Sequence, residues 1–245
     1  MNLKSTKIEK YKVYFRNREE FKRIYKEIFV NEEYKFESRL KKPFIIDCGS
    51  HIGLSIIYFK IYYPDSKILG FEPNPENFEI LKKNIETNKL RNVELVRAAV
   101  SDKEGKVPLR VSFEKKEPWT WGDTIIDNMW GDEDENKKIS VETVRLSKYI
   151  TSKVDLLKMD IEGSEQKVIE EIQNKLSLIK KIILEFHSTP TSRKENNYAI
   201  VEKILENSSF EIKIFSKDLK FLFPEFVKRL RRTSFIFTVE ATKSK

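Results

Sequence analysis

Short apolar runs alternate with amphipathic stretches along most of this chain. The runs have the length of buried strands, and most of them are followed by a polar residue or a turn. They cover residues 44–46, 67–71, 93–96, 154–159, 181–186, 210–215 and 234–239. Helical spacing appears between them, at residues 54–62, 74–85 and 198–205 and around 168–172. This alternation predicts an α/β fold with a mostly parallel sheet and helices on both faces.

The first 42 residues are predicted to form a helical segment that packs on the main domain, residues 43–245. An apolar stripe that includes Phe21 and Ile28 places a helix over residues 17–29. Asn17 is a suitable cap, with Glu20 at the reciprocal position. We expect this helix to cover an edge of the sheet or the mouth of the site, and simple core packing is the alternative.

A long stretch without periodicity, residues 113–138, interrupts the domain between two further strands at 106–112 and 139–145. It contains all three tryptophans, Trp119, Trp121 and Trp130. Because tryptophan is rare in disordered chain and such long loops are usually functional, we predict a substrate-facing loop. Its acidic run, residues 132–135, is interpreted as a solvated turn. In the strand before the loop, Pro108 favours an edge position.

Composition narrows the class of protein. The 245 residues fit one large domain, the opening residues lack a signal-peptide core, and no apolar run is long enough to span a membrane. With a single cysteine, these features predict a cytoplasmic protein. The charged fraction of 35%, rich in lysine and glutamate, predicts a thermophilic source. A net charge of +8 permits an anionic partner, but basic and acidic residues are interspersed, which does not favour nucleic acid.

Candidate chemistry begins where the first strand of the domain ends. Asp47 closes this strand, Gly49 and Gly53 provide a tight turn into an apolar helix, and Glu72 closes the next strand. An acid at that second position accepts ribose hydroxyls in dinucleotide folds. The tight Gly-x-Gly-x-x-Gly spacing that packs a pyrophosphate is absent. This combination favours a nucleoside ligand with a carboxylate and no phosphate, such as S-adenosylmethionine.

The expected cofactor contacts follow from this order of strands. The amino-acid end of S-adenosylmethionine is expected at the turn from Asp47 to Gly53, which also contains Ser50 and His51. The ribose is expected at Glu72, and the adenine against the apolar wall near Ala99. The sulfonium then points toward the end of the fourth strand, where Asp160 and Glu162 lie.

Four motifs give the chain a more specific resemblance. They are Ile46-Asp-Cys-Gly-Ser-His-Ile-Gly53, Phe71-Glu-Pro-Asn-Pro75, Ala98-Ala-Val-Ser-Asp-Lys-Glu-Gly105 and Asp155-Leu-Leu-Lys-Met-Asp-Ile-Glu-Gly-Ser-Glu165. Together they resemble the FkbM family of S-adenosylmethionine-dependent methyltransferases, over roughly residues 30–190. The resemblance implies a Rossmann-like class I sheet of seven strands with the last one antiparallel. It also implies O-methylation of a small molecule or a sugar hydroxyl. The turn departs from the family, whose members often have Gly-Ala-Asn in place of the residues found here.

An alcohol that accepts a methyl group must lose its proton, so a base is expected within reach. His187, at the end of the strand beside that of Asp160, is the first candidate, followed by Asp160 and Glu162. Each has an alternative: His187 as a structural histidine, Asp160 as an orienting group for the ligand amine, Glu162 as an anchor of its turn. With Glu185, these residues could cluster around a divalent metal, but their spacing is not diagnostic, and we assign no metal ligands.

Three functions therefore remain open from the sequence. The leading hypothesis is a methyltransferase acting on a hydroxyl of a small molecule or glycan. The alternatives are an RNA methyltransferase, and a binding module that holds the nucleoside without turnover. The sequence gives neither the acceptor nor the oligomeric state.

Overall fold

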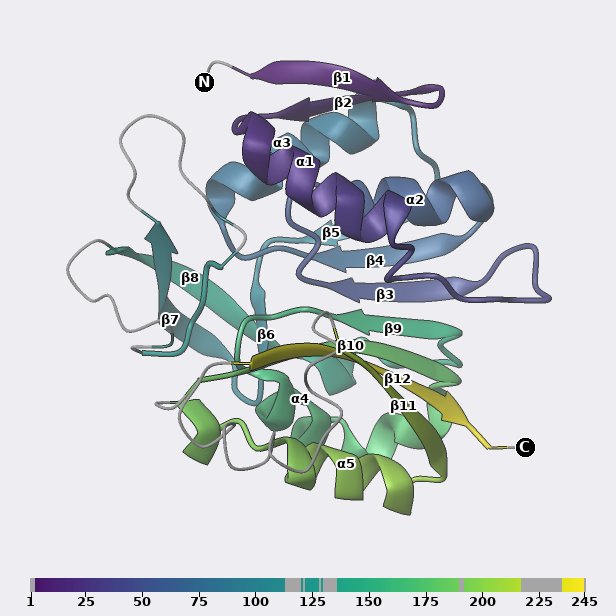
Figure 1. Ribbon diagram of the computed structural model, residues 1–245, viewed down its shortest axis with the longest axis vertical. Coiled ribbons are helices and arrows are strands. Elements are labelled where there is room, and N and C mark those ends of the chain that lie inside the picture. Colours follow the sequence, from purple (N-terminus) through teal and green to yellow (C-terminus); the bar gives the residue numbers. More distant parts are fainter. Residues whose placement is uncertain are drawn as a thin grey trace.

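The computed structural model of the chain describes residues 3–112, 120, 122–127, 129, 136–189, 192–216 and 235–244. Its centre is a seven-stranded sheet (Figure 1). In spatial order the strands are β11 (Phe210–Ser216), β12 (Phe235–Lys243), β10 (Lys181–Ser188), β9 (Leu156–Met159), β3 (Phe44–Cys48), β4 (Lys67–Phe71) and β5 (Val93–Val96). β12 is antiparallel to both of its neighbours, and the strands from β10 to β5 are parallel. This confirms the predicted α/β sheet with an antiparallel last strand.

Helices cover both faces of the sheet (Figure 1). One face carries α1 (Arg18–Tyr25), α2 (Leu54–Tyr62) and α3 (Pro75–Thr87), and the other carries α4 (Glu165–Glu171) and α5 (Tyr198–Asn207). Because neighbouring strand residues point to opposite faces, Ile45 and Ile46 of β3 belong to different buried clusters. Shorter helical turns are Lys26–Val30, Leu146–Lys148, Gln173–Leu178 and Ser192–Lys194.

Helix ends follow the local sequence. The Asn74 side chain accepts hydrogen bonds from the first backbone N–H groups of α3, and Pro75 occupies its first turn, as predicted. Asn17 caps α1 in the same way. Lys26–Val30 then continues α1 as a π-helical turn, so the predicted helix over residues 17–29 is present but changes its winding.

A second sheet of three strands, in the order β6-β8-β7, stands beside the main one. Its strands are β6 (Ala99–Ser101), β7 (Gly105–Ser112) and β8 (Asn136–Arg145). The strand predicted at 93–96 ends there and does not continue into Ala98. Ala98 N–H donates to the Val96 carbonyl at 3.1 Å, and this tight turn moves the chain from the main sheet into the second one. Pro108 does lie on an edge strand, β7.

A hairpin at the N-terminus was not predicted. Its strands are β1 (Lys4–Ile8) and β2 (Tyr11–Phe15), and α3 holds it through a buried asparagine. The Asn84 amide accepts from Tyr14 N–H at 2.7 Å and donates to the Tyr14 carbonyl at 3.1 Å, as a neighbouring strand would. Among the described residues, no helix is long and apolar enough to cross a membrane.

Candidate active site

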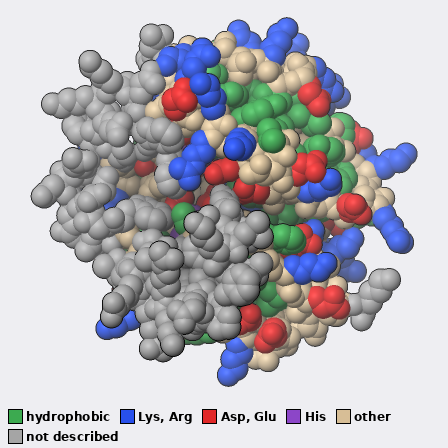
Figure 2. All heavy atoms as spheres, viewed as in Figure 1, with side chains coloured by type: hydrophobic (Ala, Val, Ile, Leu, Met, Phe, Trp, Pro, Cys, Tyr) green, Lys and Arg blue, Asp and Glu red, His purple; other side chains and the backbone are tan. Residues whose placement is uncertain are grey.

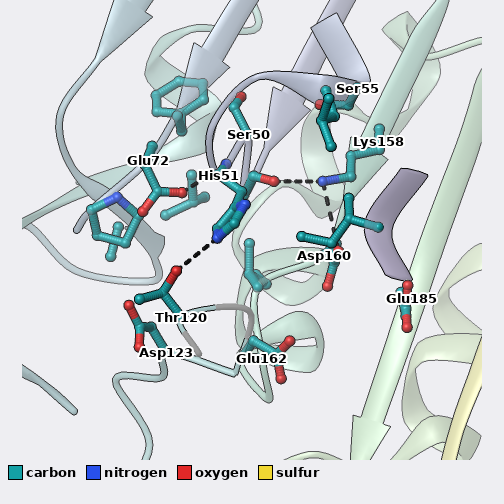
Figure 3. Close-up of a pocket in the computed structure, with 18 of the residues that line it drawn as sticks. Ser50, His51, Ser55, Glu72, Thr120, Asp123, Lys158, Asp160, Glu162 and Glu185 are labelled. Carbon is teal, nitrogen blue, oxygen red and sulfur yellow. Dashed lines mark hydrogen bonds and ion pairs between the residues drawn. The ribbon is translucent and has the colours of Figure 1, made fainter. Parts of the chain in front are cut away.

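A pocket lies at the carboxyl-terminal edge of the parallel strands (Figure 3). Its wall includes the turn after β3, Glu72 after β4, Ala99 in β6 and the segment that begins with Asp160 after β9. Glu72 and Asp160 therefore face one shared space. Arg23 of α1 also lines it, so the N-terminal helix reaches the mouth of the site.

The turn after β3 depends on its first glycine. Gly49 has a φ of +80°, and a Cβ atom there would lie 1.9 Å from the backbone oxygen of Asp160. The N–H groups of Gly49 and Ser50 both donate to the Phe71 carbonyl, which ties the turn to the end of β4. Gly49, Ser50 and His51 line the pocket, whereas Gly53 caps α2 and its missing Cβ leaves space for Leu81.

Glu72 is 5% exposed, and both of its carboxylate oxygens accept backbone hydrogen bonds. Oε2 accepts from His51 N–H at 2.8 Å, and Oε1 accepts from Asn74 N–H at 2.9 Å. Burial raises the pKa of Glu72 against the opposing charge of His51 and these hydrogen bonds. Each carboxylate oxygen has two lone pairs, so capacity for a ligand hydroxyl remains on a side chain whose position is fixed.

Asp47, predicted to contact the cofactor, is fully buried beneath the turn and does not line the pocket. Its Oδ2 accepts from Ser55 Oγ at 2.6 Å, and its Oδ1 lies 3.2 Å from Lys158 Nζ. Lys158 also donates to the carbonyl oxygens of Cys48 and Gly49, at 3.2 Å and 2.6 Å. The structure thus places Asp47 as a support of the turn.

Asp160 lines the pocket directly after β9. Its Oδ2 accepts a hydrogen bond from the Tyr34 hydroxyl at 3.1 Å and lies 3.8 Å from Lys158 Nζ. Burial lowers the pKa of Lys158, but the charges of Asp47 and Asp160 outweigh this effect and raise it. The side chain of Asp160 is 25% exposed, so it is accessible from the pocket while being held from behind.

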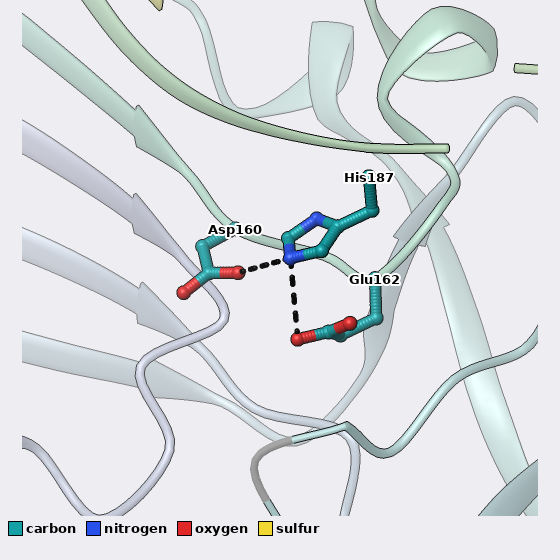
Figure 4. Close-up of side chains that lie close together, drawn as sticks. All are labelled: Asp160, Glu162 and His187. Carbon is teal, nitrogen blue, oxygen red and sulfur yellow. Dashed lines mark ion pairs between the residues drawn. The ribbon is translucent and has the colours of Figure 1, made fainter. Parts of the chain in front are cut away.

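His187 lies behind this wall, in a group of carboxylates. Its Nδ1 is 3.0 Å from Glu165 Oε1, and its Nε2 is 3.5 Å from Glu162 Oε1 and 3.8 Å from Asp160 Oδ1 (Figure 4). Glu185 Oε1 is also 3.8 Å from Nε2. Burial lowers the pKa of His187, but the surrounding carboxylates, Glu162 first, raise it well above its usual value.

Glu162 is 6% exposed and lines the pocket beside Asp160. Burial raises its pKa well above the usual range; His187 opposes this shift, and Asp160 and Glu185 add to it. Its φ of +54° lies in the left-handed region, which is uncommon for a residue with a side chain and often marks a functional turn. We call Asp160, Glu162, Glu185 and His187 the acidic corner.

Hydrogen bonds between Glu20, Thr120 and His51 form a bridge at the pocket that was not predicted from the sequence. Glu20 Oε1 accepts from Thr120 N–H at 2.5 Å, and the Thr120 hydroxyl lies 2.8 Å from His51 Nε2. Burial lowers the pKa of His51, but its hydrogen bond with Glu20 and that residue's charge raise it overall. Thr120 comes from the predicted substrate-facing loop, and it lines the pocket with Asp123. No sequence pattern links residues so far apart in the chain.

Several predicted features lie outside the described residues. These are Trp119, Trp121, Trp130 and the acidic run at 132–135.

Comparison with known proteins gives a consistent result. The model of a family described as the methyltransferase FkbM domain matches residues 47–212. "Methyltransferase sdnD" of Sordaria araneosa is 29% identical over 219 residues, covering 77% of this chain and 82% of its own length. "Methyltransferase 1" of Beauveria bassiana (strain ARSEF 2860) is 26% identical over 216 residues, covering 80% of this chain and 83% of its own length.

Two solved structures share the fold. A methyltransferase FkbM from Methylobacillus flagellatus KT superposes with a TM-score of 0.51 at 15% identity, over 87% of this chain and 47% of that protein. M. jannaschii TYW2, solved in complex with AdoMet, also has a TM-score of 0.51, at 14% identity over 98% of this chain and 84% of that one. Both are similar to this chain in the arrangement of their sheets and helices, which is Rossmann-like as predicted.

Proposed function

We propose, from the premise that this chain belongs to the FkbM methyltransferase family, that it methylates a hydroxyl group of a small molecule or a sugar. Family membership confirms the resemblance stated from the four sequence motifs. The chain is an S-adenosylmethionine-dependent methyltransferase, as the sequence predicted. The kind of acceptor and the roles of individual residues are our proposal.

The pocket residues fit the cofactor. S-adenosylmethionine supplies a methyl group on a positively charged sulfur. Glu72 is positioned to accept the ribose hydroxyls, and the absence of a Cβ on Gly49 keeps the turn close to Asp160. Ala99 is a small apolar residue in the wall, where it can pack against the adenine. Ser50 and His51 line the pocket where we place the amino-acid end of the cofactor, and Asp160 can bind the ammonium group of that end.

A hydroxyl acceptor is supported by one observation above all: Asp160 and Glu162 line the pocket with His187 directly behind them. In the reaction, the acceptor oxygen forms a bond to the methyl carbon as the carbon–sulfur bond breaks. The hydroxyl proton passes to the acidic corner. Holding the oxygen in line with the methyl group supplies much of the rate, because proximity and orientation are worth about 7–11 kcal/mol.

The charge of the pocket favours this acceptor over RNA. Its described lining includes six carboxylates, on Glu27, Glu72, Asp123, Asp160, Glu162 and Glu185, against the basic side chains of Arg23 and Lys158. On the described surface in Figure 2, lysine and arginine are interspersed with aspartate and glutamate. Phosphate-rich partners are held by clustered basic side chains, so this distribution supports a neutral acceptor. A cytoplasmic location and a thermophilic source remain proposals from composition.

The proposal is tested by incubating the protein with labelled S-adenosylmethionine and four acceptor classes: aliphatic alcohols, phenols, sugars and total RNA. We expect label in an O-methyl ether of a small alcohol or sugar, identified by mass spectrometry. Label in RNA alone would support the RNA alternative. Tight cofactor binding with no product from any class would support the non-catalytic module.

Glu72→Ala is expected to weaken S-adenosylmethionine binding by more than about 100-fold. The variant loses the two proposed hydrogen bonds from the ribose hydroxyls to a charged carboxylate, each worth about 1.5 kcal/mol or more. It also leaves the backbone N–H groups of His51 and Asn74 without their acceptor. Calorimetry with wild type and variant measures this difference. Glu79→Ala, at an exposed position of α3, is the control and should bind normally. Unchanged affinity in Glu72→Ala would remove the ribose assignment.

A further inference from the structure

Three side chains of the acidic corner converge on one point (Figure 4). One donor atom from each of Asp160, Glu162 and His187 lies within 4.8 Å of the other two. The distances from His187 Nε2 are 3.5 Å to Glu162 Oε1 and 3.8 Å to Asp160 Oδ1. Two ligands of one octahedral Mg²⁺ lie about 3 Å apart when adjacent and about 4 Å when opposite, given metal–oxygen bonds of about 2.1 Å. The observed spacing fits a shared ion.

The imidazole is oriented as metal-binding histidines are. Glu165 Oε1 lies 3.0 Å from His187 Nδ1, and Glu165 Oε2 accepts from the Asn196 side-chain amide at 2.5 Å. Asn196 also donates to the His187 carbonyl at 2.7 Å. A carboxylate on Nδ1 fixes the proton there and leaves the lone pair of Nε2 for a ligand. Nε2 faces Asp160 and Glu162.

Glu162 provides an independent observation. Its Oε2 is buried and has no hydrogen-bond partner among the described residues. A buried carboxylate oxygen without a partner is costly, because it has lost its water and gained nothing in return. In Figure 4 the Glu162 carboxylate lies next to the imidazole, with its other oxygen, Oε1, toward Nε2. A cation bound by both oxygens of the Glu162 carboxylate would satisfy Oε2.

Carboxylates are concentrated at this point. Glu185 and Glu165 contact the same imidazole as Asp160 and Glu162, so four carboxylates surround one histidine. Lys158 Nζ lies 3.8 Å from Asp160 Oδ2. Buried charges are normally paired or bound to a metal. A divalent ion is stabilised by such a group of carboxylates.

We propose that Asp160, Glu162 and His187 bind one divalent cation of the Mg²⁺ or Mn²⁺ class at the floor of the pocket. Two carboxylate oxygens favour these ions, and the imidazole nitrogen favours Mn²⁺ over Mg²⁺. Asp160 and Glu162 also line the pocket, so the ion borders the space for the acceptor. Its role rests on the proposed function: an oxygen near the ion loses its proton more readily, and the ion orients it toward the methyl group.

Mn²⁺ binding to the cofactor-free protein tests the site without any need for turnover. Free Mn²⁺ gives a sharp electron paramagnetic resonance spectrum that broadens on binding, so titration yields affinity and stoichiometry. We expect about one Mn²⁺ per chain in the wild type and an affinity weaker by more than about tenfold in Glu162→Gln. Even residues that only hydrogen-bond to a metal ligand contribute about 10-fold to 100-fold to metal affinity. Asp123→Asn, in the same pocket but outside the corner, is the matched control and should bind like the wild type.

Thermal unfolding distinguishes a loss of metal binding from a folding defect in the variant. Saturating Mn²⁺ should raise the midpoint of the wild type and of Asp123→Asn, but not that of folded Glu162→Gln, because only binding to the native state stabilises it. Absence of binding in the wild type, or equal binding in wild type, Glu162→Gln and His187→Gln, would overturn the site. If hydroxyl methylation then persists in a chelator, the proposed function stands without the metal. Site-specific Mn²⁺ binding without methylation of any hydroxyl would instead support the metal site and reject the proposed acceptor.

Discussion

His187→Ala is expected to lower turnover by about 100-fold to 10,000-fold while leaving the affinity for S-adenosylmethionine within a few fold. This range is the usual contribution of a positioned acid–base group. His187 lies behind Asp160 and Glu162 and does not line the pocket, so its loss should spare the cofactor contacts made by the turn and Glu72. The expected defect acts through Asp160 and Glu162, which His187 contacts and which line the pocket beside the acceptor hydroxyl.

Single-turnover methylation and calorimetry measure the two quantities separately. His187→Gln is the informative companion, because its amide can still donate to Glu165 but cannot replace the imidazole nitrogen that faces Asp160 and Glu162. If glutamine restored turnover, His187 would be a structural residue. Equal losses of turnover and cofactor affinity in His187→Ala would lead to the same conclusion.

The parts of the site that sequence could predict are those that depend on strand ends. Glu72 and Asp160 each follow a short apolar run, and parallel strands bring their carboxyl ends to one edge of the sheet. The order and direction of the strands are therefore enough to predict that both residues lie in one pocket, although they are far apart in sequence.

The sequence could not show whether the Asp47 side chain points into the pocket, because this depends on the register of a neighbouring strand. Asp47 of β3 is the direct partner of Lys158 in β9, and the ion pair between them takes the carboxylate away from the pocket. A lysine inside an otherwise apolar strand was a signal, since an unpaired buried ammonium is unfavourable. Its partner could not be chosen among the nearby acids without the register.

Side-chain contacts between residues far apart in the sequence could not be predicted either. Asn84 holds the N-terminal hairpin, and Glu20 holds Thr120, through hydrogen bonds that leave no periodic pattern in the sequence. The alternation of Tyr11, Val13 and Phe15 was a local signal for β2, but it is short and lies in a highly charged segment. The helix that follows had the stronger apolar stripe, and so the whole segment was interpreted as helical.

Lys158→Met is expected to reduce the free energy of unfolding by about 3–5 kcal/mol, the usual cost of removing one partner of a buried ion pair. Lys158 is 1% exposed, and it neutralises Asp47, which is fully buried. Its loss also leaves the Cys48 and Gly49 carbonyl oxygens without their lysine donor. The turn after β3 should then be less well fixed, and the affinity for S-adenosylmethionine should fall as well.

Urea unfolding measures this loss, with Lys153→Met as the control at an exposed position of the same segment, expected within about 0.5 kcal/mol of the wild type. Asp47→Asn combined with Lys158→Met should recover part of the stability, because the buried charge is then gone.

The pKa of Lys158 is raised in the folded protein. Its contribution to the free energy of unfolding is therefore complete below the unfolded pKa of about 10.4, and it is lost only as pH rises through the folded pKa. The difference between wild type and Lys158→Met should therefore stay constant from about pH 7 to about pH 9. A difference below about 1 kcal/mol, or no recovery in the double variant, would show that this ion pair does not hold the turn.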